Sequence, residues 1–417
     1  MTAPDALLVA AFDSQLKWAV RMRTALEDRG FSTRLVKPTD IRNSISDDQM
    51  ADHDGLDVEE LTWTDLLASA LDVAVVVVVM QGAFVARFCN DVQDLAATTR
   101  RRPPVLVSGW VGVVLKDATS GYLDRCAVDV LAVNSRSDLR HFAEVADSLG
   151  IPGDNLVLSG LPLLPGGLGP QREGPVTTVM YADQPTVPST QGDRSYVYRR
   201  LMDYAQAHPD RSVVLKPRHR PGEDTIHQMK FHPEVLLQGV QVPPNFRIDH
   251  TPIADRLGNL DLMLTVSSTA ALEALAAGVR TAFVADLGVR ESLGNHIFLG
   301  SGLLRTFDEI AKDDVGTPRA GWLDEYFFPV EGGSPAAHLA GRVCRVLEGA
   351  DPRPSEKVAA TAFAASQREL FRYRDCMREE GTSTRSRRLA GLRRRARLLG
   401  RAIEPAPSWR PGRRRRS

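Results

Sequence analysis

Short apolar runs alternate with amphipathic stretches along most of this chain. Val73–Met80 is the longest apolar run, and its valines predict a strand buried on both faces. Leu16–Arg29 has the helical period and stops at Gly30, a common residue after a helix. Such alternation predicts an α/β fold with parallel sheets. Strands are expected at Ala6–Phe12, Thr33–Val36, Val73–Met80, Pro104–Ser108, Val128–Val133, Leu156–Leu158, Val176–Tyr181, Val213–Lys216, Leu260–Thr265 and Arg280–Val284.

The alternation is interrupted at Leu163–Pro175, which is rich in Gly and Pro and is the best linker in the chain. A length of 417 residues allows two or three domains. Thr39–Thr62 is polar and acidic, so we expect an exposed connection with little regular structure there. The pattern predicts an α/β domain at 1–165, a second at 166–350, a helix at 351–380 and an Arg-rich tail at 381–417.

One strand-to-helix junction in the second predicted domain carries three hydroxyl side chains in a row. Ser267, Ser268 and Thr269 follow the strand Leu260–Thr265, and a helix rich in Ala and Leu then runs to Gly278. Free N–H groups and the positive dipole end at a helix start favour a bound anion. Ordinary N-capping by these hydroxyls is the alternative.

A basic turn follows another strand of the same predicted domain. Lys216, Arg218 and His219 lie within four residues of the end of Val213–Lys216, just before Pro221. A solvated loop is the alternative. Two turns suited to anions in one α/β domain favour a phosphorylated or nucleotide ligand.

Three further strand ends carry polar or aromatic candidates, and ligands of open α/β sheets bind at such ends. Asp13, Ser14 and Lys17 follow the first strand; Asp13 is the best general base of this domain, although helix capping is the alternative. Trp110 lies between two glycines and could stack a sugar or base, or belong to the core. Gln184 follows the first strand of the second domain.

A basic His-Pro-type turn followed by a Ser-Ser turn that opens a helix resembles a known pattern. It is similar to the donor-binding half of bacterial capsule polymerases, sialyltransferases and the glycerol-phosphate transferases that use CDP-glycerol. These enzymes have the GT-B fold. The chain to about Gly349 is also similar to a group of actinobacterial proteins known only by a glycosyltransferase description.

The resemblance implies two Rossmann-like domains that face each other across a cleft, with the donor nucleotide on the second. Lys216, Arg218, Ser267, Ser268 and Thr269 would hold the donor phosphates, and His219 would act in catalysis. Glu273 would bind a ribose or sugar hydroxyl, with a core-edge Glu as the alternative. Enzymes of this fold rely on protein cations in place of a metal, so we expect no metal and no cofactor beyond the nucleotide-sugar co-substrate.

The chain departs from those families at two points. Arg220 separates His219 from Pro221, whereas the family motif has Pro directly after His. The acidic Asp/Glu-Asp/Glu-Gly motif that sialyltransferases carry in the first domain has no clear copy here, so Asp13 is the substitute base.

Charge and cysteine content describe the setting. The net charge is zero, but Arg385–Ser417 holds thirteen Arg and one Glu, so this tail carries +12 and the rest of the chain −12. Four scattered cysteines suit a reducing cytosol, and no signal peptide is predicted. Within the tail, Leu and Ala recur at helical spacing between the arginines, which is typical of helices on anionic lipid. A disordered solubilising tail is the alternative, and the acidic body argues against nucleic acid.

The leading functional prediction is a cytoplasmic glycosyltransferase. It would move a sugar, for which an acidic sugar is one option, from a nucleotide donor to an envelope glycan or lipid-linked acceptor. Arg385–Arg416 would touch the inner face of the plasma membrane. Transfer of glycerol phosphate and epimerisation of a UDP-sugar are alternatives of the same fold. A non-catalytic scaffold at the membrane is a third.

Overall fold

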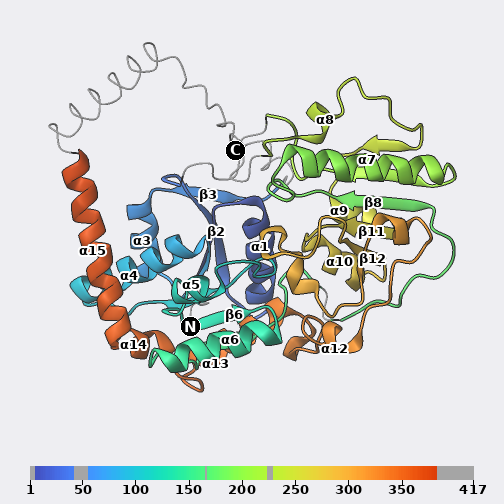
Figure 1. The fold of residues 1–417 in the computed structure, drawn as a ribbon. Helices are drawn as coiled ribbons and strands as arrows, with labels where there is room; N and C mark the ends of the chain where they lie inside the picture. The colour runs from blue at the N-terminus through green and yellow to red at the C-terminus, as the bar shows by residue number, and fades with distance from the viewer. Residues whose placement is uncertain (1–4, 42–54, 165–166, 223–228, 383–417) are drawn as a thin grey trace, which may run out of the picture. The chain divides into compact units, whose positions relative to one another are not determined.

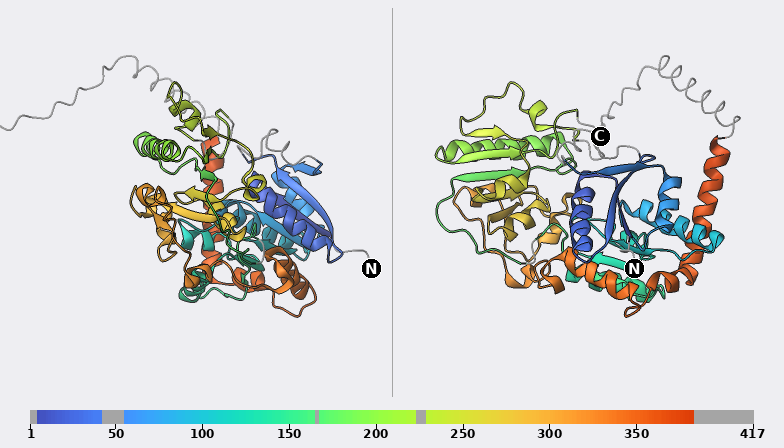
Figure 2. Two further views of the ribbon diagram at one scale, coloured as in Figure 1. Left: turned by 90° about the vertical axis from the view of Figure 1, so that its right-hand side faces the viewer. Right: turned by 180° about the vertical axis from the view of Figure 1, so that it is seen from behind.

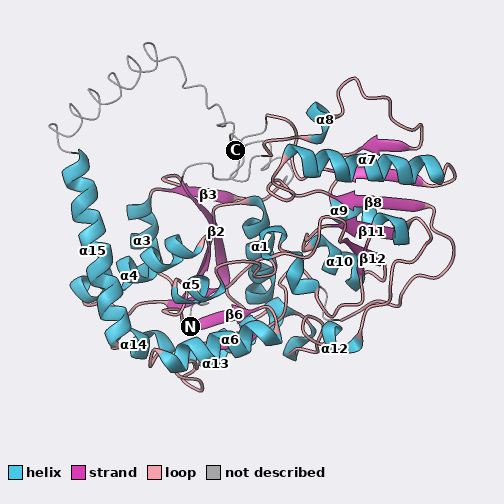
Figure 3. Cartoon of the chain, in the orientation of Figure 1, coloured by secondary structure: helices cyan, strands magenta, loops and turns pink. Residues whose placement is uncertain are grey.

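The structure is a computed structural model that describes residues 5–41, 55–164, 167–222 and 229–382. Within them the strands form two parallel sheets, of seven strands in the order β3-β2-β1-β4-β5-β6-β7 and of six in the order β10-β9-β8-β11-β12-β13. Figures 1 and 3 show the two sheets with their helices. The predicted α/β fold with two parallel sheets is confirmed. We call the parts built on the two sheets the first lobe and the second lobe.

The strands are β1 (Asp5–Ala10), β2 (Ser32–Pro38), β3 (Val58–Leu61), β4 (Val75–Val79), β5 (Val105–Ser108), β6 (Val130–Val133), β7 (Leu156–Leu158), β8 (Thr178–Ala182), β9 (Ser212–Lys216), β10 (Phe246–Ile248), β11 (Leu262–Thr265), β12 (Arg280–Val284) and β13 (Leu304–Arg305). The helices are α1 (Asp13–Glu27), α3 (Trp63–Leu71), α4 (Gly82–Thr99), α5 (Ala118–Leu123), α6 (Arg136–Ser148), α7 (Gln191–Ala207), α8 (Pro233–Leu236), α9 (Ile253–Leu257), α10 (Ala270–Ala276), α11 (Phe307–Ile310), α12 (Ala320–Leu323), α13 (Pro335–Leu347), α14 (Pro354–Ala359) and α15 (Ala362–Thr382), with short 3-10 turns η1 (Glu291–Leu293), η2 (Asn295–Phe298) and η3 (Glu331–Gly333).

The valine run forms β4 at the centre of the first sheet. Val75, Val77 and Val79 belong to one core cluster with residues of α1, while Val76 and Val78 on the other face are equally buried. A strand covered on both faces needs apolar side chains at every position, whereas a strand with one exposed face alternates apolar and polar residues. This accounts for the continuous valine run.

The second sheet has its own core. Val213 and Leu215 of β9 pack with Leu262 and Leu264 of β11 and with Leu201 of α7. Figure 2 shows this lobe from two further sides, with α7 lying beside the strands. Because all these strands are parallel, their carboxyl ends share one edge of the sheet, where ligands of open α/β sheets bind.

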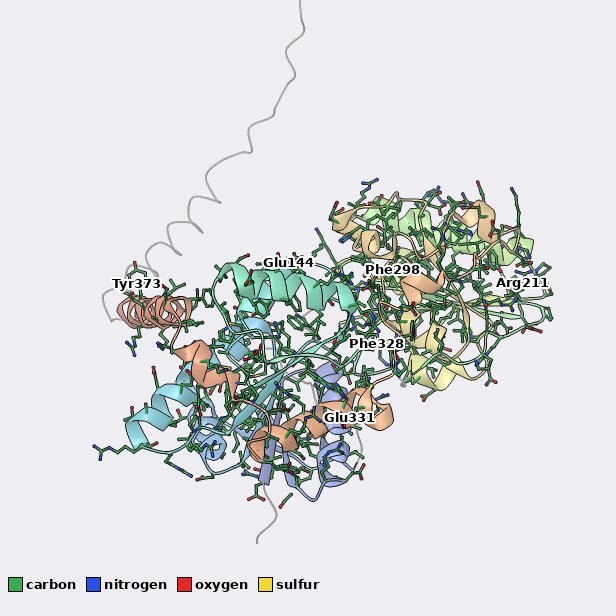
Figure 4. All side chains as sticks on the ribbon, turned by 90° about the horizontal axis from the view of Figure 1, so that it is seen from below. Glu144, Arg211, Phe298, Phe328, Glu331 and Tyr373 are labelled. Carbon is green, nitrogen blue, oxygen red and sulfur yellow. The ribbon has the colours of Figure 1, made fainter. Side chains whose placement is uncertain are left out.

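The chain returns to the first lobe earlier than the sequence suggested. Leu339, Ala340 and Val343 of α13 are buried in the first lobe's core against α1, although this segment falls inside the domain expected to run to residue 350. Amphipathic periodicity predicts a buried helix face but does not identify the core that receives it. Figure 4 marks Phe328 and Glu331 on the segment that leads into α13, and Phe298 in the second lobe.

Some elements lie where the sequence predicted none. β3 falls in the stretch expected to be irregular; it pairs with β2, and Glu59 binds Arg34 across the pair at 2.5 Å. The remainder of that stretch, residues 42–54, lies outside the described residues. The edge strand β13 is only two residues long, which is too short for a clear pattern, and β10, of three residues, lies where the pattern at Phe246–Asp249 is weak.

Beyond Thr361 the chain forms a separate compact unit. Its described part is α15, a 21-residue helix that overlaps the helix predicted at 351–380 and ends two residues beyond it. The predicted basic amphipathic helix of the tail lies outside the described residues. No helix in the described part of the chain combines the length and hydrophobicity that a membrane span requires.

Candidate active site

The carboxyl ends of β8, β9 and β11 form one continuous edge in the second lobe. Asp183 N donates to Lys216 O at 2.9 Å, which ties the end of β8 to that of β9. On the other side, Gln184 Oε1 accepts from Ser267 N at 3.1 Å and lies 2.9 Å from Ser267 Oγ. The structure thus brings together two predicted site residues, Gln184 and Ser267.

The three hydroxyl residues of the second junction have different surroundings. Ser267 is buried, and its Oγ also lies 2.6 Å from Leu293 O, so it links three segments. Ser268 Oγ accepts from Ala270 N at 3.3 Å, which is a capping contact at the start of α10. Thr269 faces the first lobe: its Oγ1 accepts from Val113 N at 3.5 Å.

Charged side chains of α1 in the first lobe act electrostatically on Glu273 of α10. Glu273 is largely buried, and burial raises the pKa of its carboxyl, while Arg21 and Lys17 of α1 act in the opposite direction. Lys17 also binds Asp13 at 3.0 Å. Asp13 and Lys17 of the first lobe therefore lie in the same charged region as Glu273 of the second. Ser14, in the first turn of α1, is partly exposed.

The basic turn after β9 is folded back on itself. Lys216 is buried and its Nζ donates to Pro217 O at 2.8 Å, whereas Arg218 is exposed. His219 Nε2 accepts from Met229 N at 3.2 Å, and its Nδ1 lies 3.0 Å from Arg220 O. Both ring nitrogens of His219 are therefore engaged by backbone groups.

A family model described as "Putative glycosyltransferase (DUF6716)" matches residues 6–344. The chain belongs to this family. The matched residues include both sheets, all the contacts described above and most of α13. No curated protein matches the sequence.

Solved structures share the fold of this family member. A UDP-N-acetylglucosamine 2-epimerase from Neisseria meningitidis, bound to UDP-GlcNAc, is 10% identical, with 83% of this chain and 99% of that chain covered and a TM-score of 0.51. A structure assigned to the same epimerase class from Listeria monocytogenes is 11% identical, covers 84% and 98%, and has a TM-score of 0.50. The S. aureus MnaA–UDP structure is 11% identical, covers 83% and 96%, and has a TM-score of 0.50. These likenesses establish a GT-B-like fold with two parallel sheets.

Sequence patterns did not reveal the support behind Gln184 in this family member. Arg194 of α7 is buried and donates to Asp183 Oδ2 at 3.0 Å and to Pro185 O at 2.7 Å, while Tyr198 OH donates to Asp183 Oδ2 at 2.5 Å. This network holds residues 183–185 in place at the end of β8. The sequence pattern that could have indicated this network is an Arg and a Tyr four residues apart on the apolar face of α7.

Trp110 is packed within the first lobe. Its ring stacks on Phe142 with centroids 5.0 Å apart, and the Arg125 guanidinium carbon lies 4.6 Å from the ring centroid. The contacts hold the partly buried ring within the first lobe, and its role in stacking a sugar or base stays a prediction.

No group of three or more His, Cys, Asp or Glu in the described ranges could hold a metal ion. The ends of the parallel strands present backbone N–H groups, cations and carboxylates.

Proposed function

We propose that this protein transfers a sugar from a nucleotide-activated donor to a glycan or lipid-linked acceptor. Membership of the glycosyltransferase family supports transfer as the reaction class. A protein of the same fold holds UDP-GlcNAc in its structure, which supports a nucleotide sugar as the donor. A donor from the sialyl or CDP-glycerol class would fit the Ser-Ser and basic turns.

The observation that carries the proposal is the edge at the ends of β8, β9 and β11, where Gln184 is joined to Ser267 and Thr269 faces the first lobe. Glu273 lies on the helix that starts there, and Lys17 and Arg21 of α1 act on its carboxyl electrostatically. A carboxylate held in a largely buried position can accept hydrogen bonds from ribose or sugar hydroxyls. Lys17 and Arg21 come from the other lobe, so a ligand there would touch both lobes. The backbone N–H group of Thr269, with Arg218 from the basic turn, would carry the negative charge of the leaving phosphate. Ser268 N donates to Thr265 Oγ1 at 3.3 Å.

Transfer also requires that the acceptor hydroxyl lose a proton. Asp13 is our candidate base, because its carboxylate stands at the first turn of α1 next to Lys17. His219 would act in catalysis only after exchange of its contacts with Arg220 O and Met229 N. We assign the charge of the leaving group to protein cations and invoke no metal.

Glu273→Gln tests the donor site, because it keeps the size of the side chain and removes the charge. Wild-type protein should be stabilised by one class of nucleotide sugar in a thermal-shift screen of UDP, CMP, CDP and GDP conjugates. A ligand at a hundred times its Kd adds about 2.7 kcal/mol to the free energy of unfolding. Loss of a charged hydrogen-bond partner should weaken binding by about 1.5–3 kcal/mol, roughly 10- to 150-fold.

Glu144→Gln is the matched control, since Glu144 is exposed on α6 of the first lobe (Figure 4). Equal shifts in both variants would remove Glu273 from the donor site. Product analysis then separates the reactions: a new glycosidic bond supports transfer, a UDP-sugar epimer supports epimerisation, and a glycerol-phosphate product supports the CDP-glycerol class. No stabilisation of folded wild type by any conjugate would favour the scaffold alternative.

A further inference from the structure

The loop Gly109–Val113, here called the bridge loop, leaves the end of β5 and is held by two buried polar side chains. Arg125 Nε donates to Gly109 O at 3.1 Å. Asn134 Nδ2 donates to Trp110 O at 2.9 Å and to Gly112 O at 2.8 Å. Three of the five carbonyl groups of the loop are thus fixed by side chains of the first lobe.

Both side chains are costly to bury. Arg125 is 6% exposed, and its guanidinium also donates to Gly121 O and Met80 O, so its hydrogen bonds go to neutral backbone carbonyls. Asn134 is 1% exposed, and its Oδ1 has no hydrogen-bond partner within the described residues. Desolvating a guanidinium and leaving an amide oxygen unpaired both reduce stability. Groups that cost stability and converge on one loop are typical of a functional site.

The far end of the bridge loop meets the second lobe at the start of α10. Val113 N donates to Thr269 Oγ1 at 3.5 Å. A Cβ added at Gly112 would lie 3.0 Å from the same oxygen, so the loop backbone passes close to the Thr269 side chain there. A side chain at position 112 would require the Thr269 hydroxyl or the loop to shift.

We propose that Arg125 and Asn134 are positioning residues that set the spacing of the two lobes through the bridge loop. This inference rests on the proposed transfer function. The donor binds to the second lobe, and Asp13 and the acceptor belong to the first. A bridge loop of fixed shape keeps the reacting groups of the two lobes at one separation, and small errors in such a separation lower rates strongly. Neither Arg125 nor Asn134 needs to touch the substrate.

Asn134→Ala and Asn155→Ala form a matched pair for the test. Asn155 is also buried, donates through Nδ2 to Cys126 O at 2.9 Å and Val128 O at 3.0 Å, and has an Oδ1 without a partner among the described residues. It precedes β7 and holds a different loop. We expect similar falls in Tm for the two variants. The activities are compared at a temperature where both variants stay folded. There, Asn134→Ala should lower kcat roughly tenfold or more, with donor affinity changed less than about twofold. Asn155→Ala should keep kcat and donor affinity near the wild-type values.

Gly112→Ala is a second test variant, and it keeps Arg125 and Asn134, which hold the bridge loop. The added methyl pushes against Thr269, so kcat should fall with little loss of Tm. Equal kcat values for Asn134→Ala and Asn155→Ala, or a fall confined to donor affinity, would overturn the proposal.

Amide hydrogen exchange separates this proposal from the transfer function itself. If positioning holds, Asn134→Ala should increase exchange in the peptide covering 267–276 of the other lobe, and Asn155→Ala should not. The increase in exchange is expected even if the protein turns over no donor. A protein that shows the increase but no turnover would overturn only the proposed function. Unchanged exchange at 267–276 in Asn134→Ala would overturn the positioning role whatever the activity.

Discussion

At the scale of single residues, Asp261 ties the starts of two neighbouring strands together. Its Oδ2 accepts from Thr177 N at 2.8 Å and Thr178 N at 2.9 Å, and from both threonine hydroxyls. Burial acts to raise the pKa of this carboxyl, but the hydrogen bonds from Thr177 and Thr178 outweigh it and lower the pKa to about 2. The ionised form is therefore the one that stabilises the fold.

The sign of the pH dependence follows from that shift. A folded-state pKa below the unfolded value gives stability that is present above pH ~4 and is lost as the pH falls towards 2. Asp261→Asn should lower the free energy of unfolding by about 1–2 kcal/mol at pH 6, and this difference should shrink between pH 4 and 2. Chemical denaturation across this range is the measurement. Asp255→Asn removes the same charge at an exposed site, and an equal pH dependence there would contradict the assignment.

The hydrogen-bond partners of the candidate site residues also explain which of these residues could be predicted from the sequence. Strand ends rich in hydroxyls or cations were visible locally, and the structure brings Ser267 and Gln184 together. The orientation of Ser267 depends on Leu293, and that of His219 on Met229, both distant in sequence. The electrostatic influence of Lys17 on Glu273 acts between the lobes. Local pattern can locate a turn, but it contains no information on the long-range partners that bury or free its side chains.

At the scale of elements, the strands were predictable because buried parallel strands are continuous apolar runs, as in β4. β3 was missed because its sequence is Val-Glu-Glu-Leu at a sheet edge, where Arg34 pairs with Glu59. α13 lies in the segment that the sequence assigned to the second domain, and its place against α1 was not predicted. That placement depends on the segment between α12 and α13, which is anchored to the first lobe.

Glu325 anchors this segment at the start of α6. Its carboxylate accepts from Ser137 N at 2.7 Å and binds Arg140 at 3.0 Å. Burial alone would raise the pKa of Glu325. The hydrogen bonds from Arg140 and Ser137 lower the pKa by more, so it lies below its usual value. Glu325→Gln should reduce the free energy of unfolding by about 1–2 kcal/mol, because an anion at a helix N-terminus is lost.

Urea denaturation of Glu325→Gln at low and high salt checks this anchor. The loss should be smaller in 1 M salt, where the Debye length is about 3 Å. Glu144→Gln, on the exposed face of the same helix, should change stability by less than about 0.5 kcal/mol. A salt-independent loss in Glu325→Gln would mean that packing, and not charge, holds the segment.

At the scale of the whole molecule, the chain combines two lobes with an uneven distribution of charge. The +12 of Arg385–Ser417 balances −12 in the rest of the sequence. An acidic body gains nothing from an anionic surface, so any attraction to one must come from the tail. The lipid-linked acceptor in the proposed function gives such an attraction a purpose, because it would hold the enzyme where its acceptor is.

Replacing Arg393–Arg395 and Arg413–Arg416 with Gln in the full chain tests this role. Each Arg near an anionic membrane contributes about 1 kcal/mol, so loss of even three effective contacts should weaken binding to phosphatidylserine vesicles by roughly 100-fold. Co-sedimentation at low and high salt measures it, with neutral phosphatidylcholine vesicles as the control. Nucleotide-sugar binding should be unchanged, because none of the residues of the proposed donor site belongs to the tail. Equal sedimentation of wild type and variant with anionic vesicles would exclude the tail as a membrane contact and leave the solubilising alternative.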